Sequence, residues 1–209
     1  SGDDWVLNSH EMSISETTNE VFNMSCYKYT TAQTVPYFLR VQVASEADTP
    51  QKWHDTFKRY NSGTYNNQWQ ILSVKHFVPG KPLPNGSFWL GEQAPGLYVA
   101  KDMTSYLNEN RYWGSYNVAY FPEVWYWSGY GPMYQQYGNA FSWSMCPRAQ
   151  IYRRDQHKVQ DLDSLKRIQR YNQYQTDPLS LHDACRGIAA RCDLNTPWSN
   201  NTLNGMAAF

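Results

Sequence analysis

The stretch RYWGSYNVAYFPEVWYWSGYGPMYQQYGNAFSWSMCPRAQIYRRDQ, residues 111–156, is the most informative part of the chain. Ten Tyr and Trp residues fall between Tyr112 and Tyr137. Each of these side chains has an apolar body and a polar tip that needs a hydrogen-bond partner once it is buried. The stretch therefore suits the wall of a cavity. Asn117 and Arg148 add an amide and a permanent cation to it.

Alternating apolar and polar side chains predict strands on the N-terminal side of this stretch. The predicted strands cover residues 5–9, 12–18, 69–77 and 87–92. A polar turn joins the first two, and Asn19 ends the second. The last two are expected to form a hairpin across a Pro- and Gly-rich loop at residues 79–86.

Apolar residues at helical spacing predict helices over residues 34–44, from Thr49, over residues 102–109 and after Asp161. In the second helix Pro50 takes the first position. One side carries Trp53, Phe57 and Tyr60, which we expect in the core. Asp161 is expected to cap the last helix, whose apolar side carries Leu162, Leu165 and Ile168. Hairpin strands covered by helices indicate an α+β fold.

No repeat, low-complexity run or charge block divides the chain. We therefore predict a single domain-sized piece over residues 1–209, with an irregular tail at 179–209. Because the chain starts with Ser1 and has no charged-then-apolar leader, we expect a processed piece of a longer protein.

The charge balance excludes some classes of partner. Eighteen Lys and Arg match eighteen Asp and Glu, so no net field draws the protein to nucleic acid. No apolar run approaches the about 20 residues that span a bilayer, so we expect no membrane-spanning segment.

Cysteines and glycosylation sequons favour a secretory or lysosomal location. N-x-S/T sequons occur at Asn23, Asn85 and Asn200. Cys185 and Cys192 are close enough in sequence to close a small loop, so we predict a disulfide between them. Cys26 and Cys146 are distant in sequence. A zinc site is disfavoured because the chain has neither a CxxC nor an HxxxH pair, and we expect neither metal nor cofactor.

Several phrases of the chain resemble one known family. They are SYN at 115–117, WSGY at 127–130, PRAQIYRRDQ at 147–156, ETTNEVFN at 16–23, YNSGTYNNQW at 60–69 and LKRIQRYNQYQTDP at 165–178. Over residues 4–195 the chain resembles the phospholipase B-like family of N-terminal-nucleophile hydrolases. The resemblance implies an αββα sandwich that hydrolyses ester or amide bonds, with phospholipid acyl esters or lipid-like amides as substrates.

In the family that the chain resembles, the nucleophile is a cysteine exposed by self-cleavage, and its α-amino group serves as the base. The phrase that contains this cysteine is absent here, because residues 1–19 match a region downstream of it. The resemblance implies a Cys nucleophile on a missing segment, or on a companion chain of the same proteolytically processed precursor. This chain alone is then expected to be inactive.

By resemblance, three residues belong to the supporting half of the catalytic site. Asn19 matches a polar residue on the substrate side, and Asn117 matches an amide of the oxyanion hole. Arg148 matches an arginine whose charge favours a thiolate. We expect Thr18, Trp113 and Tyr116 to contact substrate.

Each catalytic candidate also has a structural interpretation. Asn19 could cap a turn, and Asn117 could satisfy buried Tyr hydroxyls. Arg148 could pair with Asp155 or Glu123. We expect adjacent Arg153, Arg154 and Asp155 to form structural ion pairs.

Two cysteines and the first residue are weaker candidates for the nucleophile. Cys26 and Cys146 have no neighbouring His or free amine in sequence, so a disulfide or a buried thiol is the better interpretation. Ser1 has a free amine, but SGDDW matches an interior loop of the family.

Two other functions stay open. The chain could belong to a noncatalytic structural or interaction glycoprotein that retains this fold, or to a carbohydrate-binding module suggested by its Trp and Tyr residues. A companion chain that begins with Cys distinguishes the hydrolase from the noncatalytic glycoprotein, whereas the binding module would need exposed coplanar rings.

Overall fold

A computed structural model describes residues 5–31 and 37–195 of the chain. It divides the chain into two compact units, Ser1–Met133 and Tyr134–Phe209, which are described separately. The expectation of a single domain-sized piece stays a prediction.

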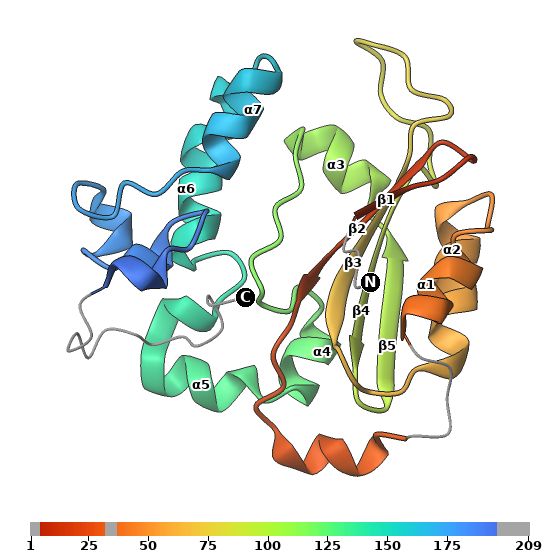
Figure 1. Ribbon diagram of the computed structural model, residues 1–209, viewed down its shortest axis with the longest axis horizontal. Coiled ribbons are helices and arrows are strands. Elements are labelled where there is room, and N and C mark those ends of the chain that lie inside the picture. The colour runs from red at the N-terminus through yellow and green to blue at the C-terminus, as the bar shows by residue number, and fades with distance from the viewer. Residues whose placement is uncertain (1–4, 32–36, 196–209) are drawn as a thin grey trace. The chain divides into compact units, whose positions relative to one another are not determined.

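The first unit is built on a five-stranded antiparallel sheet in which every strand pairs with its neighbours in sequence (Figure 1). Its strands are β1 (Trp5–Leu7), β2 (Met12–Thr18), β3 (Asn67–Ser73), β4 (Phe88–Ala94) and β5 (Leu97–Asp102). The four predicted strands are confirmed, although β3 ends at Ser73 instead of Phe77. Strand β5 was not predicted from the sequence, and it pairs with β4 across a two-residue turn where Gly96 has φ 74°.

Helices accompany the sheet in the first unit. They are α1 (Tyr37–Ala44), α2 (Pro50–Phe57), α3 (Thr104–Asn110) and α4 (Pro122–Trp127), and α5 (Tyr130–Tyr137) runs on into the second unit. The Thr49 side chain caps α2 by accepting the Lys52 N–H at 3.3 Å, and Pro50 takes the first position as predicted. Residues 34–36 of the first predicted helix lie outside the described residues. The described ranges contain no helix of the length and apolarity that a membrane crossing needs.

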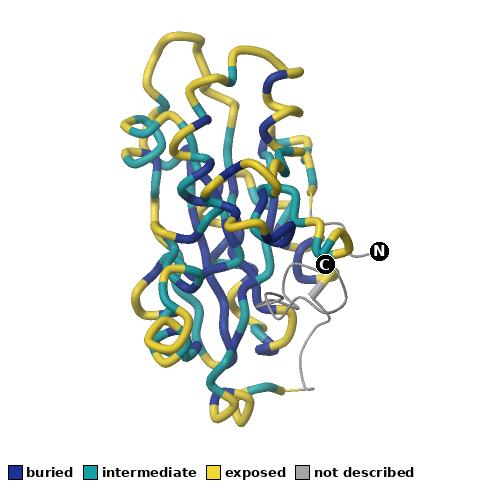
Figure 2. Tube along the Cα trace, turned by 90° about the vertical axis from the view of Figure 1, so that its left-hand side faces the viewer, coloured by how far each residue is buried: buried dark blue, intermediate teal, exposed yellow. Residues whose placement is uncertain are grey.

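Helices α1 and α2 lie against one face of the sheet and enclose an apolar core (Figure 1). Trp53 of α2 stacks on Phe57 at a ring distance of 4.8 Å and reaches Trp69 of β3 at 5.2 Å. Tyr60 was expected on the same side and is 58% exposed. That prediction is wrong because α2 ends at Phe57 and a 3-10 turn redirects the chain. Figure 2 shows buried backbone running along the strands.

The other face of the sheet carries a cluster of polar side chains. Because side chains alternate along a strand, the residues between the core positions point away from α1 and α2. They include Ser15 and Thr17 of β2, Gln68 and Gln70 of β3, and Glu92 of β4, with the apolar Phe88 and Leu90 on the same face of β4. Gln68 and Glu92 are directly opposite each other in the β3–β4 register and both are fully buried. A buried polar face must find partners within the protein, and the segment around Asn117 provides several of them.

Helices α6 (Pro147–Asp155) and α7 (Leu162–Gln169) belong to the second unit. Asp161 caps α7 as predicted, in a capping box with Ser164. Of the predicted apolar side only Ile168 is buried, whereas Leu162 and Leu165 are 64% and 41% exposed. The predicted helix is confirmed, but helical spacing gives the side of a helix and not whether another element covers it.

An ion-pair network and a disulfide stabilise the second unit. Arg154 contacts Asp155 at 2.7 Å and the buried Asp177 at 2.9 Å. The hydrogen bonds from Arg154 lower the pKa of Asp155 to about 2. The structural role expected for Arg154 and Asp155 is thus confirmed. The predicted disulfide between Cys185 and Cys192 is present, with 4.5 Å between the Cα atoms.

Candidate active site

Asn19 directly follows the last residue of β2 and is buried. Its backbone N–H donates to the Asn66 carbonyl at 2.8 Å. Its side-chain Nδ2 donates to Oε1 of Glu92 at 3.1 Å, across 73 residues of sequence. The side chain therefore makes a long-range contact and does not cap a local turn.

Asn117 lies in a segment that crosses close to the end of β2. Its backbone has φ 56°, a left-handed conformation that Asn tolerates better than most residues. Nδ2 donates to the Thr18 carbonyl at 2.7 Å, and Ser115 and Thr17 join their hydroxyls in a second bond. The phrases SYN and ETTN are thereby brought side by side. The Tyr130 hydroxyl donates to the backbone carbonyl of Asn117, at 3.4 Å, and not to its side chain.

Glu92 connects these two segments through hydrogen bonds. It was not among the site residues predicted from the sequence. Its Oε1 accepts from Asn19 Nδ2, from Gln68 Nε2 at 2.6 Å and from the Tyr120 N–H at 2.8 Å. Its Oε2 accepts from the Phe121 N–H at 2.9 Å. Burial raises the pKa of Glu92, and the hydrogen bonds it accepts oppose that rise. The sequence signal was a Glu within the strand FWLGEQA. Carboxylates are rarely buried without partners, so a Glu in a buried strand indicates hydrogen-bond donors nearby.

The predicted substrate-contacting residues lie around the same point. Thr18 supplies the carbonyl that holds Asn117. Trp113 donates its indole N–H to Gln68 Oε1 at 3.1 Å, and its ring meets Tyr120 edge-on at 4.9 Å. Tyr116 is 2% exposed, so its ring is part of the interior of this unit. Their contact with a substrate stays a prediction.

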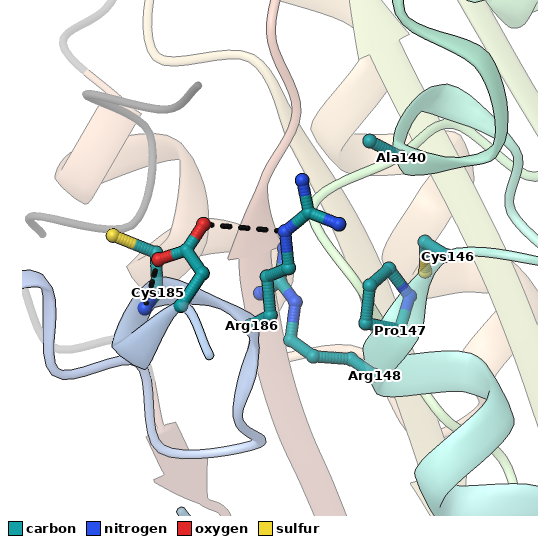
Figure 3. Close-up of a pocket in the computed structure, with 7 residues that line it drawn as sticks. Ala140, Cys146, Pro147, Arg148, Cys185 and Arg186 are labelled. Carbon is teal, nitrogen blue, oxygen red and sulfur yellow. Dashed lines mark hydrogen bonds and ion pairs between the residues drawn. The ribbon is translucent and has the colours of Figure 1, made fainter. Parts of the chain in front are cut away.

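Arg148 belongs to the second unit, in the first turn of α6. It lines a small cavity of about 30 Å³ together with Cys146, Pro147 and Arg186 (Figure 3). Such a space holds about one water molecule. Burial raises the pKa of the Cys146 thiol, and the charge of Arg148 opposes that rise. The possible carboxylate partners have other contacts: Asp155 pairs with Arg154 and Lys158, and Glu123 pairs with Lys101.

Cys26 and Cys146 are free thiols, and both are buried. Burial raises the pKa of Cys26 as well, which disfavours the reactive thiolate. The interpretation as buried thiols is confirmed for both.

A family model for phospholipase B matches residues 1–208. The chain belongs to the phospholipase B family.

Similarity to individual members of the phospholipase B family extends over nearly all of the chain. It is 41% identical over 194 residues to a phospholipase B of Crotalus adamanteus, covering 92% of this chain and 35% of that protein. It is 41% identical over 196 residues to human phospholipase B-like 1, covering 93% and 35%. It is 42% identical over 205 residues to mouse putative phospholipase B-like 2, covering 93% and 34%. The chain thus spans about a third of the length of these phospholipase B relatives.

Proposed function

We propose that this chain supplies the supporting half of the active site of a hydrolase that cleaves ester or amide bonds, with phospholipid acyl esters among its substrates. The nucleophile is a cysteine on another segment or on a companion chain of the same precursor. Asn117 acts as a donor to the oxyanion and Asn19 contacts the reacting groups. Arg148 favours the thiolate of the nucleophile, and the chain alone is inactive.

The main support for this proposal is that two segments distant in sequence, ETTN and SYN, lie side by side. Hydrogen bonds fix the side-chain amides of Asn19 and Asn117 there. The bond from Asn117 to the Thr18 carbonyl and the bond from Asn19 to Glu92 set the direction of each amide. A donor fixed before the reaction stabilises an oxyanion without reorganisation, which is what acyl transfer requires. Membership of a family whose relatives are named phospholipase B makes acyl esters the first substrates to test.

We further propose that the sheet is one layer of an αββα sandwich. Helices α1 and α2 cover one face with apolar contacts, and the polar face carries the candidate site. Catalytic groups in such a fold would lie on the side of the sheet away from the helical layer.

The proposed function is tested by the composition and activity of the native protein. We expect intact mass and N-terminal sequencing, under reducing and nonreducing conditions, to show a companion chain that begins with Cys. The same material is expected to release fatty acid from a phospholipid, and replacing that Cys by Ser should abolish the release. A companion with another first residue, or no release by the native protein, would favour a noncatalytic glycoprotein instead.

We also propose that the protein is secreted or lysosomal. The disulfide between Cys185 and Cys192 supports this, because disulfides persist in oxidising compartments. The sequons differ in structural setting. Asn85 is exposed in the loop before β4, whereas Asn23 is half-buried and donates Nδ2 to the Trp127 carbonyl at 3.2 Å. Asn200 lies outside the described residues.

Asn85 is the sequon at which glycosylation can be tested most directly. We expect protein from eukaryotic cells to carry a glycan there, because the exposed amide projects from a loop that packing does not cover. Enzymatic deglycosylation in heavy-oxygen water converts a glycosylated Asn to labelled Asp, so peptide mass spectrometry reads occupancy directly. Asn85→Gln should remove one glycan from the intact mass. An unlabelled Asn85 peptide would contradict the prediction.

A further inference from the structure

The two ends of the Asn19 amide have different surroundings. Nδ2 donates to Glu92 at 3.1 Å, whereas Oδ1 has no hydrogen-bond donor among residues 5–31 and 37–195. Asn19 is only 4% exposed, so Oδ1 is a buried acceptor. Buried polar atoms nearly always have a partner in folded proteins, and an exception needs a specific explanation.

Glu92 fixes this orientation of the amide. The three other groups that reach its carboxylate are all donors: the Gln68 side chain and the Tyr120 and Phe121 N–H groups. Oε1 already accepts from the Gln68 side chain and the Tyr120 N–H, so the NH₂ end of Asn19 faces it as a third donor. The opposite orientation would place the amide oxygen against a carboxylate oxygen. The acceptor Oδ1 is therefore directed away from Glu92.

We propose that Glu92 is a positioning residue that makes Asn19 the hydrogen-bond acceptor of the site, and that Oδ1 receives an N–H or O–H donor. The donor belongs either to the substrate or to the segment that carries the nucleophile. This inference rests on the proposed function. Asn117 also donates Nδ2 within the protein, to the Thr18 carbonyl, so it is the second N–H of its NH₂ group that would serve an oxyanion.

An acceptor next to an oxyanion donor has a consequence for substrate class. The scissile carbonyl oxygen of any acyl substrate needs a donor, and Asn117 is the candidate for that role. An amide substrate also carries an N–H next to that carbonyl, and a lysophospholipid carries a free hydroxyl near it. A fully acylated diester has neither. The acceptor thus favours amides or hydroxyl-bearing lipids, provided that the donor comes from the substrate.

The contact between Glu92 and Asn19 can be tested without any activity. In full-length Asn19→Asp, two carboxyl groups meet, and they are stable only while they share a proton. Its thermal midpoint is expected to fall, relative to wild type, as pH rises from about 4 to about 8. In Asn19→Asp/Glu92→Gln this extra fall should disappear when the double variant is compared with Glu92→Gln alone. Equal pH dependence in both backgrounds would overturn the positioning role of Glu92.

The acceptor role is tested with two substrates that share an acyl chain, one an amide and one an ester. Asn19→Ala in the full-length protein is expected to lower kcat/KM by about tenfold or more, the effect of one hydrogen bond. If the substrate brings the donor, the loss falls on the amide alone. If the nucleophile segment brings it, kcat falls equally for both substrates while KM is unchanged.

A third variant separates the acceptor role from simple loss of packing. Asn19→Asp keeps an outward-facing oxygen while it shares a proton with Glu92, so it should recover activity at acidic pH and lose it as pH rises. If Asn19→Ala is as active as wild type on both substrates, or Asn19→Asp is as inactive as Asn19→Ala at every pH, the acceptor role is wrong. A wild-type protein that hydrolyses neither substrate would remove the proposed function and the acceptor role together. The thermal midpoints would still show whether Glu92 positions Asn19.

Discussion

Replacing Asn117 by Ala in the full-length protein is expected to lower turnover about a hundredfold, the effect of losing one oxyanion donor. The bond from Nδ2 to the Thr18 carbonyl at 2.7 Å fixes the amide before any substrate arrives. Removing the side chain removes that fixed donor while leaving the sheet and its core intact. Turnover should fall with KM little changed, because a developing oxyanion exists only in the transition state.

The backbone of Asn117 requires a second variant. At φ 56° an Ala side chain is strained, whereas Gly adopts this conformation freely. Asn117→Gly should therefore show the same loss of turnover without the loss of stability that strain would cause. Asn110→Ala is a matched control, because its Nδ2 also donates to a backbone carbonyl, that of Tyr106 at 2.9 Å. Normal turnover in both Asn117 variants would exclude this residue from the site.

Local patterns were sufficient to predict most elements of the sheet and several helix ends. Alternation located β1 to β4, and the pair Thr49 and Pro50 marked the start of α2. The strand β5 was missed because residues 97–102, LYVAKD, do not alternate between apolar and polar and follow directly on a two-residue turn. Tyr60 was wrongly placed in the core, since a pattern cannot show that the helix stops three residues earlier.

Residues of the candidate site could be predicted only where they lie in a segment that resembles the family. Asn19 and Asn117 were named from ETTN and SYN, and the structure brings those phrases together. Glu92 was not named, because a single Glu in a strand does not reveal a contact with a residue 73 positions away. Long-range pairing of polar groups depends on sheet register. In this sheet Gln68 is opposite Glu92, and one residue of slippage would turn either side chain to the apolar face.

His54 is a titratable residue outside the candidate site. Its buried surroundings disfavour the protonated, charged imidazole. It is 1% exposed, and its Nδ1 is 2.6 Å from the Tyr98 hydroxyl. Its ring packs directly on Gly91 of β4, where an added Cβ would be 2.4 Å from Nδ1. Burial lowers the pKa of His54 to about 3, with the backbone of Trp89 and the charge of Asp55 opposing the shift. The folded protein therefore holds this imidazole neutral over most of the acidic range.

The low pKa of His54 makes folding sensitive to acid. The unfolded chain takes up a proton near the ordinary pKa of 6.5, and the folded protein does not until about 3. Stability from this residue is therefore complete above pH about 6.5 and is lost as pH falls toward about 3, by up to roughly 3–5 kcal/mol. We expect the thermal midpoint of the full-length protein to fall over this range. It should fall less steeply in His54→Asn, which can keep the contact with Tyr98.

Replacing His54 also removes packing contacts, which lowers the thermal midpoint at every pH. The slope of the midpoint against pH is therefore the quantity that reports the protonation of His54. His76→Asn is the matched control, since His76 is exposed and its replacement should leave the wild-type slope unchanged. A slope in His54→Asn equal to that of wild type would contradict the prediction. In a lysosome, one of the two locations proposed, the protein would carry this destabilisation continuously. Asp155 behaves differently: Arg154 lowers its pKa to about 2, so the stability from this ion pair is complete above pH 3.8 and is lost only as pH falls toward about 2.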